Sequence, residues 1–148
     1  MIPGKYWIGV IFMVRLIMGV KGSGKTKQLI EMINNAAKDE PGNVVCIEAN
    51  RNLTYDIHYQ IRLIEAQEYK LSNYDMYRGF ISGLYAGNYD ISHIFIDNLC
   101  KTMGGEVTQA TEDFLNWLDA FGEKNGIKFT VTISADLALA TDGMQKYL

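Results

Sequence analysis

The chain has 148 residues, enough to bury a core and about the size of one domain. It is 48% hydrophobic and 21% charged, as globular proteins usually are, and its net charge of −3 argues against nucleic acid as a partner. The two cysteines, Cys46 and Cys100, form neither a close metal-binding pair nor a disulfide framework. A reducing, cytoplasmic location is therefore expected.

The first residues contain an apolar run, "YWIGVIFMV", which could be mistaken for a membrane segment. Arg15 interrupts the run, and a spanning helix needs roughly 20 apolar residues, so no membrane insertion is expected. No small-residue cleavage pattern follows it, which argues against a signal peptide. We expect residues 1–12 to be an N-terminal extension or an extra strand, and residues 13–148 to form a single domain.

The first part of this domain predicts a strand, a helix and a second strand. Val14–Met18 is a short continuous apolar run, as expected for a strand buried on both faces. Apolar residues then recur at helical spacing over Lys25–Lys38, and Pro41 and Gly42 block a continuation. Asn43–Glu48 is a second run rich in β-branched residues. This order indicates the βαβ unit of a parallel sheet.

The remainder of the chain continues the alternation. A strand near Ile61–Ile64 is favoured over a short helix, and Asn73–Tyr85 predicts a helix with Ser72 as its N-cap. His93–Asn98 predicts a buried strand that ends in a carboxylate. The remaining expected elements are a helix over Gln109–Lys124, a strand over Ile127–Ser134 and a last helix over Leu137–Leu148, broken at Gly143. The pattern predicts an α/β fold with a mostly parallel sheet of about five strands flanked by helices.

The stretch between the first strand and the first helix, "GVKGSGKT", matches the phosphate-binding pattern G-x-x-x-x-G-K-[ST]. Its glycines allow successive backbone N–H groups to face a phosphate, and the helix N-terminus adds partial positive charge. Lys25 is expected to reach the β- and γ-phosphates, and the Thr26 hydroxyl is expected to bind Mg²⁺. The predicted nucleotide-binding residues are Gly19, Val20, Lys21, Gly22, Ser23, Gly24, Lys25 and Thr26.

These residues resemble the Walker A motif of the P-loop nucleoside triphosphatases. The resemblance implies a three-layer α/β fold and a second motif, Walker B, which is an apolar strand ending in an Asp that holds Mg²⁺. The stretch "HIFID" supplies such a strand, with Asp97 as the implied metal ligand. A carboxylate at the carboxyl end of a parallel strand also lies where open α/β sheets bind ligands. A carboxylate that only caps the following turn is the structural alternative.

The catalytic base is less clearly indicated. Members of the superfamily with an additional strand between the Walker A and Walker B strands often have Glu directly after the Walker B Asp, where this chain has Asn98. An amide cannot accept a proton at neutral pH. Glu48 is similar in placement to the glutamate of the RecA-like ATPases, and Glu65 is the other option. Ser134 stands where such ATPases keep a polar sensor of the γ-phosphate, although a turn serine explains it equally well.

The layout also resembles the nucleotide domain of the thymidine kinases, and more weakly a group of small bacterial P-loop proteins labelled as twitching-motility ATPases. It departs from the kinases because it has neither a Cys-rich zinc lobe nor a base after Asp97. No N-K-x-D motif for guanine occurs, so ATP is the expected nucleotide. The resulting hypothesis is a Mg²⁺-dependent ATP-binding protein, a small P-loop ATPase. The alternatives are a nucleotide-binding regulatory or assembly protein without significant turnover, and a small-molecule kinase of the nucleoside type. A protein partner or a second copy that supplies an arginine is left open.

Overall fold

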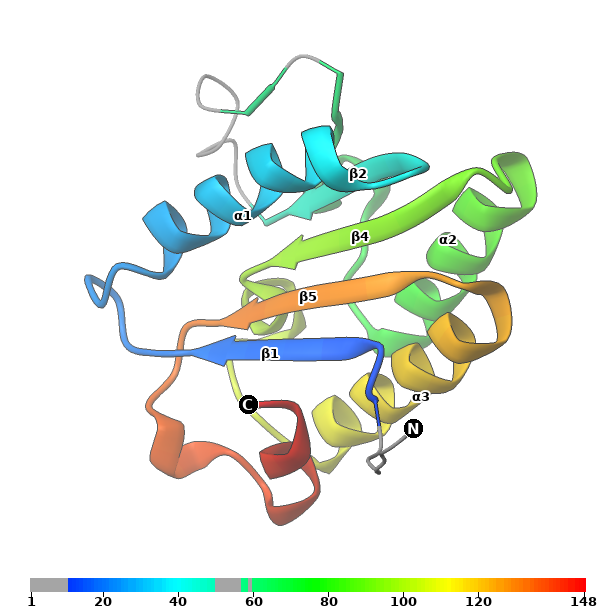
Figure 1. Ribbon diagram of the computed structural model, residues 1–148. Helices are drawn as coiled ribbons and strands as arrows, with labels where there is room; N and C mark the ends of the chain where they lie inside the picture. The colour runs from blue at the N-terminus through cyan, green and yellow to red at the C-terminus, as the bar shows by residue number, and fades with distance from the viewer. Residues whose placement is uncertain (1–10, 50–56, 59) are drawn as a thin grey trace.

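The computed structural model describes residues 11–49, 57, 58 and 60–148, and the sheet within them is entirely parallel. Its five strands lie in the order β1-β5-β4-β2-β3 (Figure 1). This arrangement confirms the predicted α/β class and the mostly parallel sheet of about five strands. The strands are β1 (Val14–Met18), β2 (Asn43–Glu48), β3 (Arg62–Glu65), β4 (Ile91–Asp97) and β5 (Lys128–Ile133).

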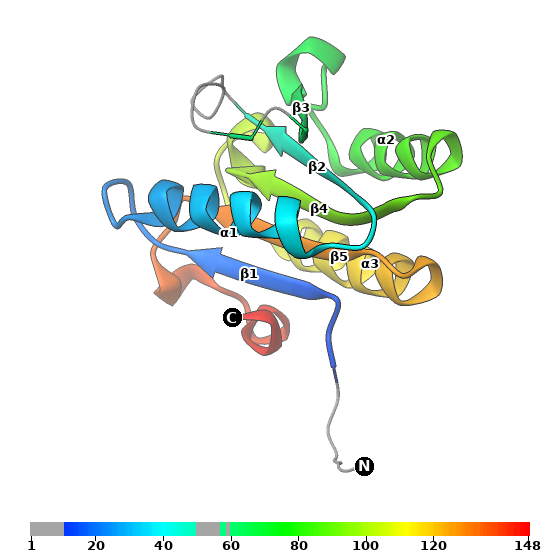
Figure 2. The same ribbon diagram turned by 45° about the horizontal axis from the view of Figure 1, so that its top comes forward.

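Helices cover both faces of this sheet. The first helix, α1, lies on one face, and the other two long helices, α2 and α3, lie on the opposite face (Figures 1 and 2). Short 3-10 helices, labelled η, make up several of the connections. The bounds are α1 (Lys25–Asp39), α2 (Tyr74–Gly87), α3 (Gln109–Asn125), η1 (Ala66–Tyr69), η2 (Leu99–Met103), η3 (Leu137–Leu139) and η4 (Asp142–Tyr147).

The strands are largely apolar because each face of the sheet has its own core. On the α1 face, Leu29 and Ile33 are fully buried and belong to the same apolar cluster as Phe95 of β4. On the other face, Phe114 of α3 is buried in a larger cluster that includes Val131 of β5. Two covered faces are the usual setting of a parallel sheet, which explains why most residues of these strands are apolar.

The strand register brings the carboxyl ends of the central strands to one edge of the sheet. Glu48 of β2 is paired with Asp97 of β4, and Met18 of β1 is paired with Ile133 of β5. The arrowheads of β1, β5 and β4 accordingly point the same way (Figure 1). The loop after β1 and the residues that follow β4 and β5 therefore meet at the edge where open α/β sheets bind their ligands.

The N-cap of α2 differs from the prediction. The cap is Asn73 rather than Ser72, and the Asn73 side chain accepts a hydrogen bond from the Met76 backbone N–H at 2.8 Å. Asparagine and serine are both favoured N-caps, so the composition of the helix start did not decide between the two neighbours.

Asn73→Ala is expected to lower the free energy of unfolding by about 1 kcal/mol, because the substitution removes the acceptor for an N–H group of the first helical turn. The matched control is Ser72→Ala, which is expected to leave that free energy almost unchanged. Denaturant unfolding of the two variants measures the difference. Equal destabilisation by both substitutions would contradict the observed cap.

The predicted last helix over Leu137–Leu148 is wrong, because the segment forms two separate 3-10 helices, η3 and η4. Gly143 does not break a helix but lies inside η4. Contacts with α3 organise the segment: Glu112 accepts hydrogen bonds from the Thr141 hydroxyl at 2.6 Å and from the Gly143 backbone N–H at 3.1 Å. These tertiary hydrogen bonds take the place of a regular α-helical ladder.

The predicted N-terminal extension, residues 1–12, falls mainly on residues 1–10, which lie outside the described part of the chain. Residues 11 and 12 are described and belong to no strand. The Met13 backbone N–H donates to Asp119 of α3 at 2.7 Å, so the start of β1 is held against that helix. No helix in the described ranges combines the length and the apolar character that crossing a membrane requires.

Candidate functional site

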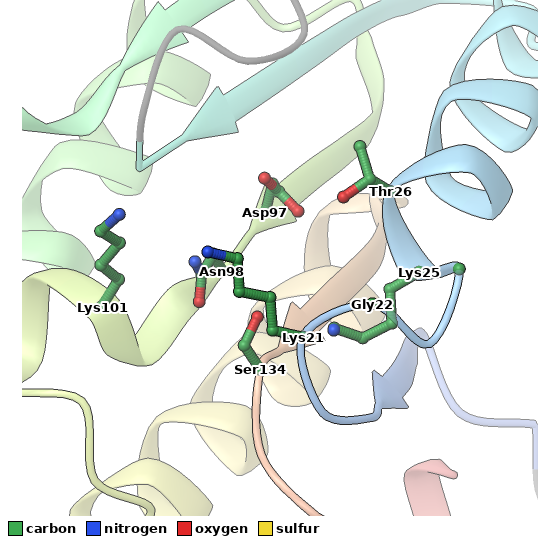
Figure 3. A pocket seen from close by; sticks show the side chains of 9 residues that line it. Lys21, Gly22, Lys25, Thr26, Asp97, Asn98, Lys101 and Ser134 are labelled. Carbon is green, nitrogen blue, oxygen red and sulfur yellow. The ribbon is translucent and has the colours of Figure 1, made fainter.

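A pocket of about 500 Å³ lies at the carboxyl edge of the sheet (Figure 3). The loop after β1, the start of α1, the end of β4 with the turn that follows it, and the residue after β5 all contribute to its lining. Its volume is in the range of small-molecule binding sites. The lining residues are Lys21, Gly22, Gly24, Lys25, Thr26, Asp97, Asn98, Lys101 and Ser134.

The loop after β1 has the backbone of an anion-binding turn. Gly22 and Gly24 both have φ of 88°, a left-handed conformation that a side chain at Cβ would strain. The Ser23 N–H bonds the Val20 carbonyl at 3.1 Å and closes a tight turn. The helix then begins at Lys25 with no side-chain cap and no acidic residue in its first turn. Its first N–H groups and the positive end of its dipole therefore face the pocket without a competing carboxylate from the helix itself.

Three lysines give the pocket its positive charge. The Lys25 ammonium donates to the carbonyl of Val20 at 3.1 Å, so it rests on the loop that it is expected to complete. Lys21 comes from the same loop, and Lys101 comes from η2, on the side of the pocket opposite Thr26 (Figure 3). Asp97 is the single acidic residue among the lining residues that the structure describes.

Thr132 of β5 fixes the position of Asp97. Its hydroxyl donates to Oδ1 of Asp97 at 2.8 Å and accepts from the Asn98 backbone N–H, also at 2.8 Å. The Thr132 side chain is buried, and both hydrogen bonds are partly buried. Burial raises the pKa of the Asp97 carboxyl, while the Thr132 hydrogen bond and the positive charge of Lys25 oppose that rise.

Thr132→Val is expected to lower the free energy of unfolding by about 1–3 kcal/mol, because the partly buried N–H group of Asn98 loses its acceptor. It is also expected to weaken any ligand binding that depends on the orientation of Asp97. Thr130→Val is the control: Thr130 is equally buried on the same strand, but its hydroxyl pairs with His93 instead of Asp97. Denaturant unfolding and calorimetric titration with Mg²⁺–nucleotide measure the two effects. Equal ligand affinity in the two variants would contradict the orienting role of Thr132.

Most of the residues predicted from the sequence meet in this pocket. Of the loop residues, Gly19, Val20 and Ser23 belong to the turn but are not part of the lining. Glu48 is in register with Asp97 on the neighbouring strand, is 1% exposed, and is also absent from the described lining. Its role as a base therefore stays a prediction. The predicted residues that line the pocket are Lys21, Gly22, Gly24, Lys25, Thr26, Asp97 and Ser134.

Two residues of the site were missed by the sequence patterns. Lys101 lies four residues after Asp97 in a short 3-10 helix, and no periodicity marks it. Thr132 lies in a strand that reads as uniformly buried. A signal for it does exist, because Thr130 and Thr132 are polar, lie two residues apart on one face of the strand and are both buried, so each hydroxyl needs a hydrogen-bond partner.

Asn98 has a left-handed backbone, with φ and ψ both at 54°. Asparagine tolerates this conformation better than most side chains do. A glutamate at this position would tolerate the left-handed backbone less well than the asparagine does. The Asn98 side chain lines the pocket beside Asp97 (Figure 3).

No protein-family model matches the chain, and no curated protein matches it at a significant level. The function is therefore inferred from the chemistry of the pocket.

Proposed function

We propose that the chain binds ATP with Mg²⁺ and is a small ATPase of the P-loop type. The observation that carries this proposal is the convergence of Lys25, Thr26 and Asp97 on one pocket from separate elements, the loop with α1 on one side and β4 on the other. A coincidental glycine-rich turn would have no reason to share a pocket with a half-buried carboxylate that follows a strand two positions away in the sheet.

The charge of the pocket supports a polyphosphate ligand. With three lysines and one aspartate ionised, the lining residues carry a net charge of +2, although the whole chain carries −3. The Mg²⁺ complex of ATP carries a net charge of about −2, so the two are complementary. A neutral ligand of the same size would leave the positive charge of the three lysines uncompensated.

The order of the strands also supports the resemblance to additional-strand P-loop ATPases. In that class an extra strand separates the Walker A and Walker B strands. Here β5 lies between β1, which precedes the loop, and β4, which ends in Asp97. Ser134 follows β5 directly and lines the pocket, in keeping with a sensor of the γ-phosphate.

The oxygens of Thr26 and Asp97 fit a magnesium ion, which prefers oxygen ligands and usually takes only one or two from the protein when phosphates supply others. Within the described residues no group of three or more His, Cys, Asp or Glu side chains could hold a metal without such help. Bound Mg²⁺ would neutralise phosphate charge. The chain itself would contribute the loop amides and Lys25, which hold the β- and γ-phosphates and stabilise the charge that develops during transfer.

A nucleotide-binding regulatory protein with negligible turnover is the second candidate, and Asn98 favours it. The amide beside Asp97 cannot remove a proton from water, although it can orient one through hydrogen bonds. On this candidate the chain alternates between nucleotide-bound and nucleotide-free states without rapid hydrolysis.

Calorimetric titration of the purified chain with a non-hydrolysable ATP analogue tests the proposed binding. We expect one binding event that strengthens when Mg²⁺ is added, and weaker binding of the matching GTP analogue. Absence of binding at millimolar analogue would refute the proposal.

Phosphate release from ATP separates the two candidates once binding is established. Release by the native chain well above that of the Asp97→Asn variant supports the ATPase. Equal release by the two proteins at saturating nucleotide supports the regulatory candidate, because phosphate release that does not depend on Asp97 is background hydrolysis.

A further inference from the structure

A second, smaller pocket of about 310 Å³ adjoins the one already described. It lies between the connection from β3 to α2 and the 3-10 helix η2. Lys101 lines both pockets, so the two spaces meet at this side chain. The residues that line the second pocket are Gln67, Lys70, Leu71, Ser72, Lys101 and Thr102.

The lining of the second pocket is cationic and rich in hydrogen-bonding groups. Lys70 and Lys101 supply two positive charges, and no acidic side chain is present among the described lining residues. Gln67, Ser72 and Thr102 add neutral amide and hydroxyl groups. This concentration of positive charge in a chain with a net charge of −3 favours an anionic occupant.

The backbone holds Lys70 in a fixed and unusual position. Its φ of 54° and ψ of 44° are left-handed, a conformation that costs free energy for a residue with a side chain. The Lys70 N–H bonds the Gln67 carbonyl at 3.1 Å, and the Leu71 N–H bonds the Ala66 carbonyl at 3.2 Å. The Leu71 side chain is buried and anchors the turn. Lys70 is the C-cap of η1, where glycine would relieve the strain, so a lysine-to-glycine change here removes the positive charge without straining the backbone.

We infer that the second pocket binds a small molecule that carries a phosphate or carboxylate group, next to the pocket proposed for the nucleotide. The inference extends the proposed function, and it rests on that function only for what occupies the first pocket. Lys70 and Lys101 pair with the anionic group, while the neutral side chains hydrogen-bond to the remainder of the molecule. Because Lys101 serves both pockets, occupancy of one changes the affinity of the other.

A titration with inorganic phosphate, followed by the backbone amide resonances of the ¹⁵N-labelled full chain, tests this inference. We expect two sets of amides to shift with saturation, one around Gly22 and Gly24 and one around Gln67, Ser72 and Thr102. Lys25→Ala should remove the first set and keep the second. If only the first set of amides fails to shift, the result counts against the nucleotide cradle. If only the second set fails to shift, the inference about the second pocket is overturned, so the two failures are distinguishable.

Lys70→Gly is the sharpest variant, because it removes the charge and suits the left-handed backbone. We expect it to weaken phosphate binding at the second set by at least tenfold while its melting temperature stays equal to or above that of the native chain. Lys124→Gln, a change at an exposed lysine near the end of α3, should leave both sets unchanged. Undiminished binding in Lys70→Gly, or a loss of equal size in Lys124→Gln, would overturn the inference.

Discussion

Lys25→Ala is expected to weaken binding of the ATP analogue by about 100-fold or more, equivalent to about 2.7 kcal/mol of binding free energy. The Lys25 ammonium rests against the loop carbonyl of Val20, within the pocket where the phosphates would lie. Its removal leaves phosphate charge without its main cationic partner. The loop turn itself should persist, because the hydrogen bond between the backbone groups of Ser23 and Val20 does not involve the lysine side chain. Calorimetric titration in the presence of Mg²⁺ measures the change.

The matched control is Lys27→Ala, which removes an equal charge from the same helix two residues further on. Lys27 is exposed and does not belong to the pocket lining. Its variant should bind the analogue within a few-fold of the native chain. If the two variants lose affinity equally, general electrostatic attraction accounts for binding and the cradle interpretation fails.

Asp97→Asn is expected to abolish the strengthening of nucleotide binding by Mg²⁺ without harming the fold. The amide oxygen can still accept the Thr132 hydrogen bond, so the local geometry is preserved. The negative charge that attracts the metal is lost. Titrations of both proteins with and without Mg²⁺ measure the effect. An unchanged response to Mg²⁺ in the variant would contradict the proposed role of Asp97 as a metal ligand.

Although Asp97→Asn is expected to impair the response to Mg²⁺, it is expected not to lower the free energy of unfolding at neutral pH. This expectation follows from the raised pKa of Asp97. Because the folded state binds this proton more tightly than the unfolded state does, the carboxyl favours folding most below its ordinary pKa of 3.8. That contribution is lost as the pH rises through the raised folded pKa. At neutral pH Asp97→Asn should therefore be at least as stable as the native chain, and its relative advantage should shrink toward pH 3. Denaturant unfolding between pH 3 and pH 7 measures the difference in free energy of unfolding between the variant and the native chain. If this difference favours the variant less at pH 7 than at pH 3, the raised pKa of Asp97 is contradicted.

The parallel sheet was predictable because its strands are short apolar runs separated by clear stops. Val14–Met18 and Asn43–Glu48 match the observed strands, and the helix after the loop differs from the prediction by one residue at its end. The last segment was not predictable, because apolar spacing over Leu137–Leu148 resembles a helix in isolation. Its actual form depends on hydrogen bonds to Glu112, and that contact is invisible until α3 is placed.

The residues of the site also fall into those that the sequence predicts and those that only the fold reveals. The loop and Asp97 follow from local patterns with a known chemical meaning. The sequence patterns do not reveal Thr132 or Lys101. Thr132 contacts Asp97 because β5 lies beside β4 in the sheet, and Lys101 lines the pocket from η2, which follows β4. The left-handed backbone of Asn98 was also hidden, since the sequence identifies an amide but not the conformation that favours it.

The position of β5 has a mechanical consequence for the site. Since β5 separates β1 from β4, the glycine-rich loop and Asp97 follow strands that are two spacings apart, about 10 Å in an ordinary sheet. The backbone pairing of β1 with β5 and of β5 with β4 sets this separation. The spacing between the glycine-rich loop and Asp97 is thus set by the sheet itself and not by the connections around it.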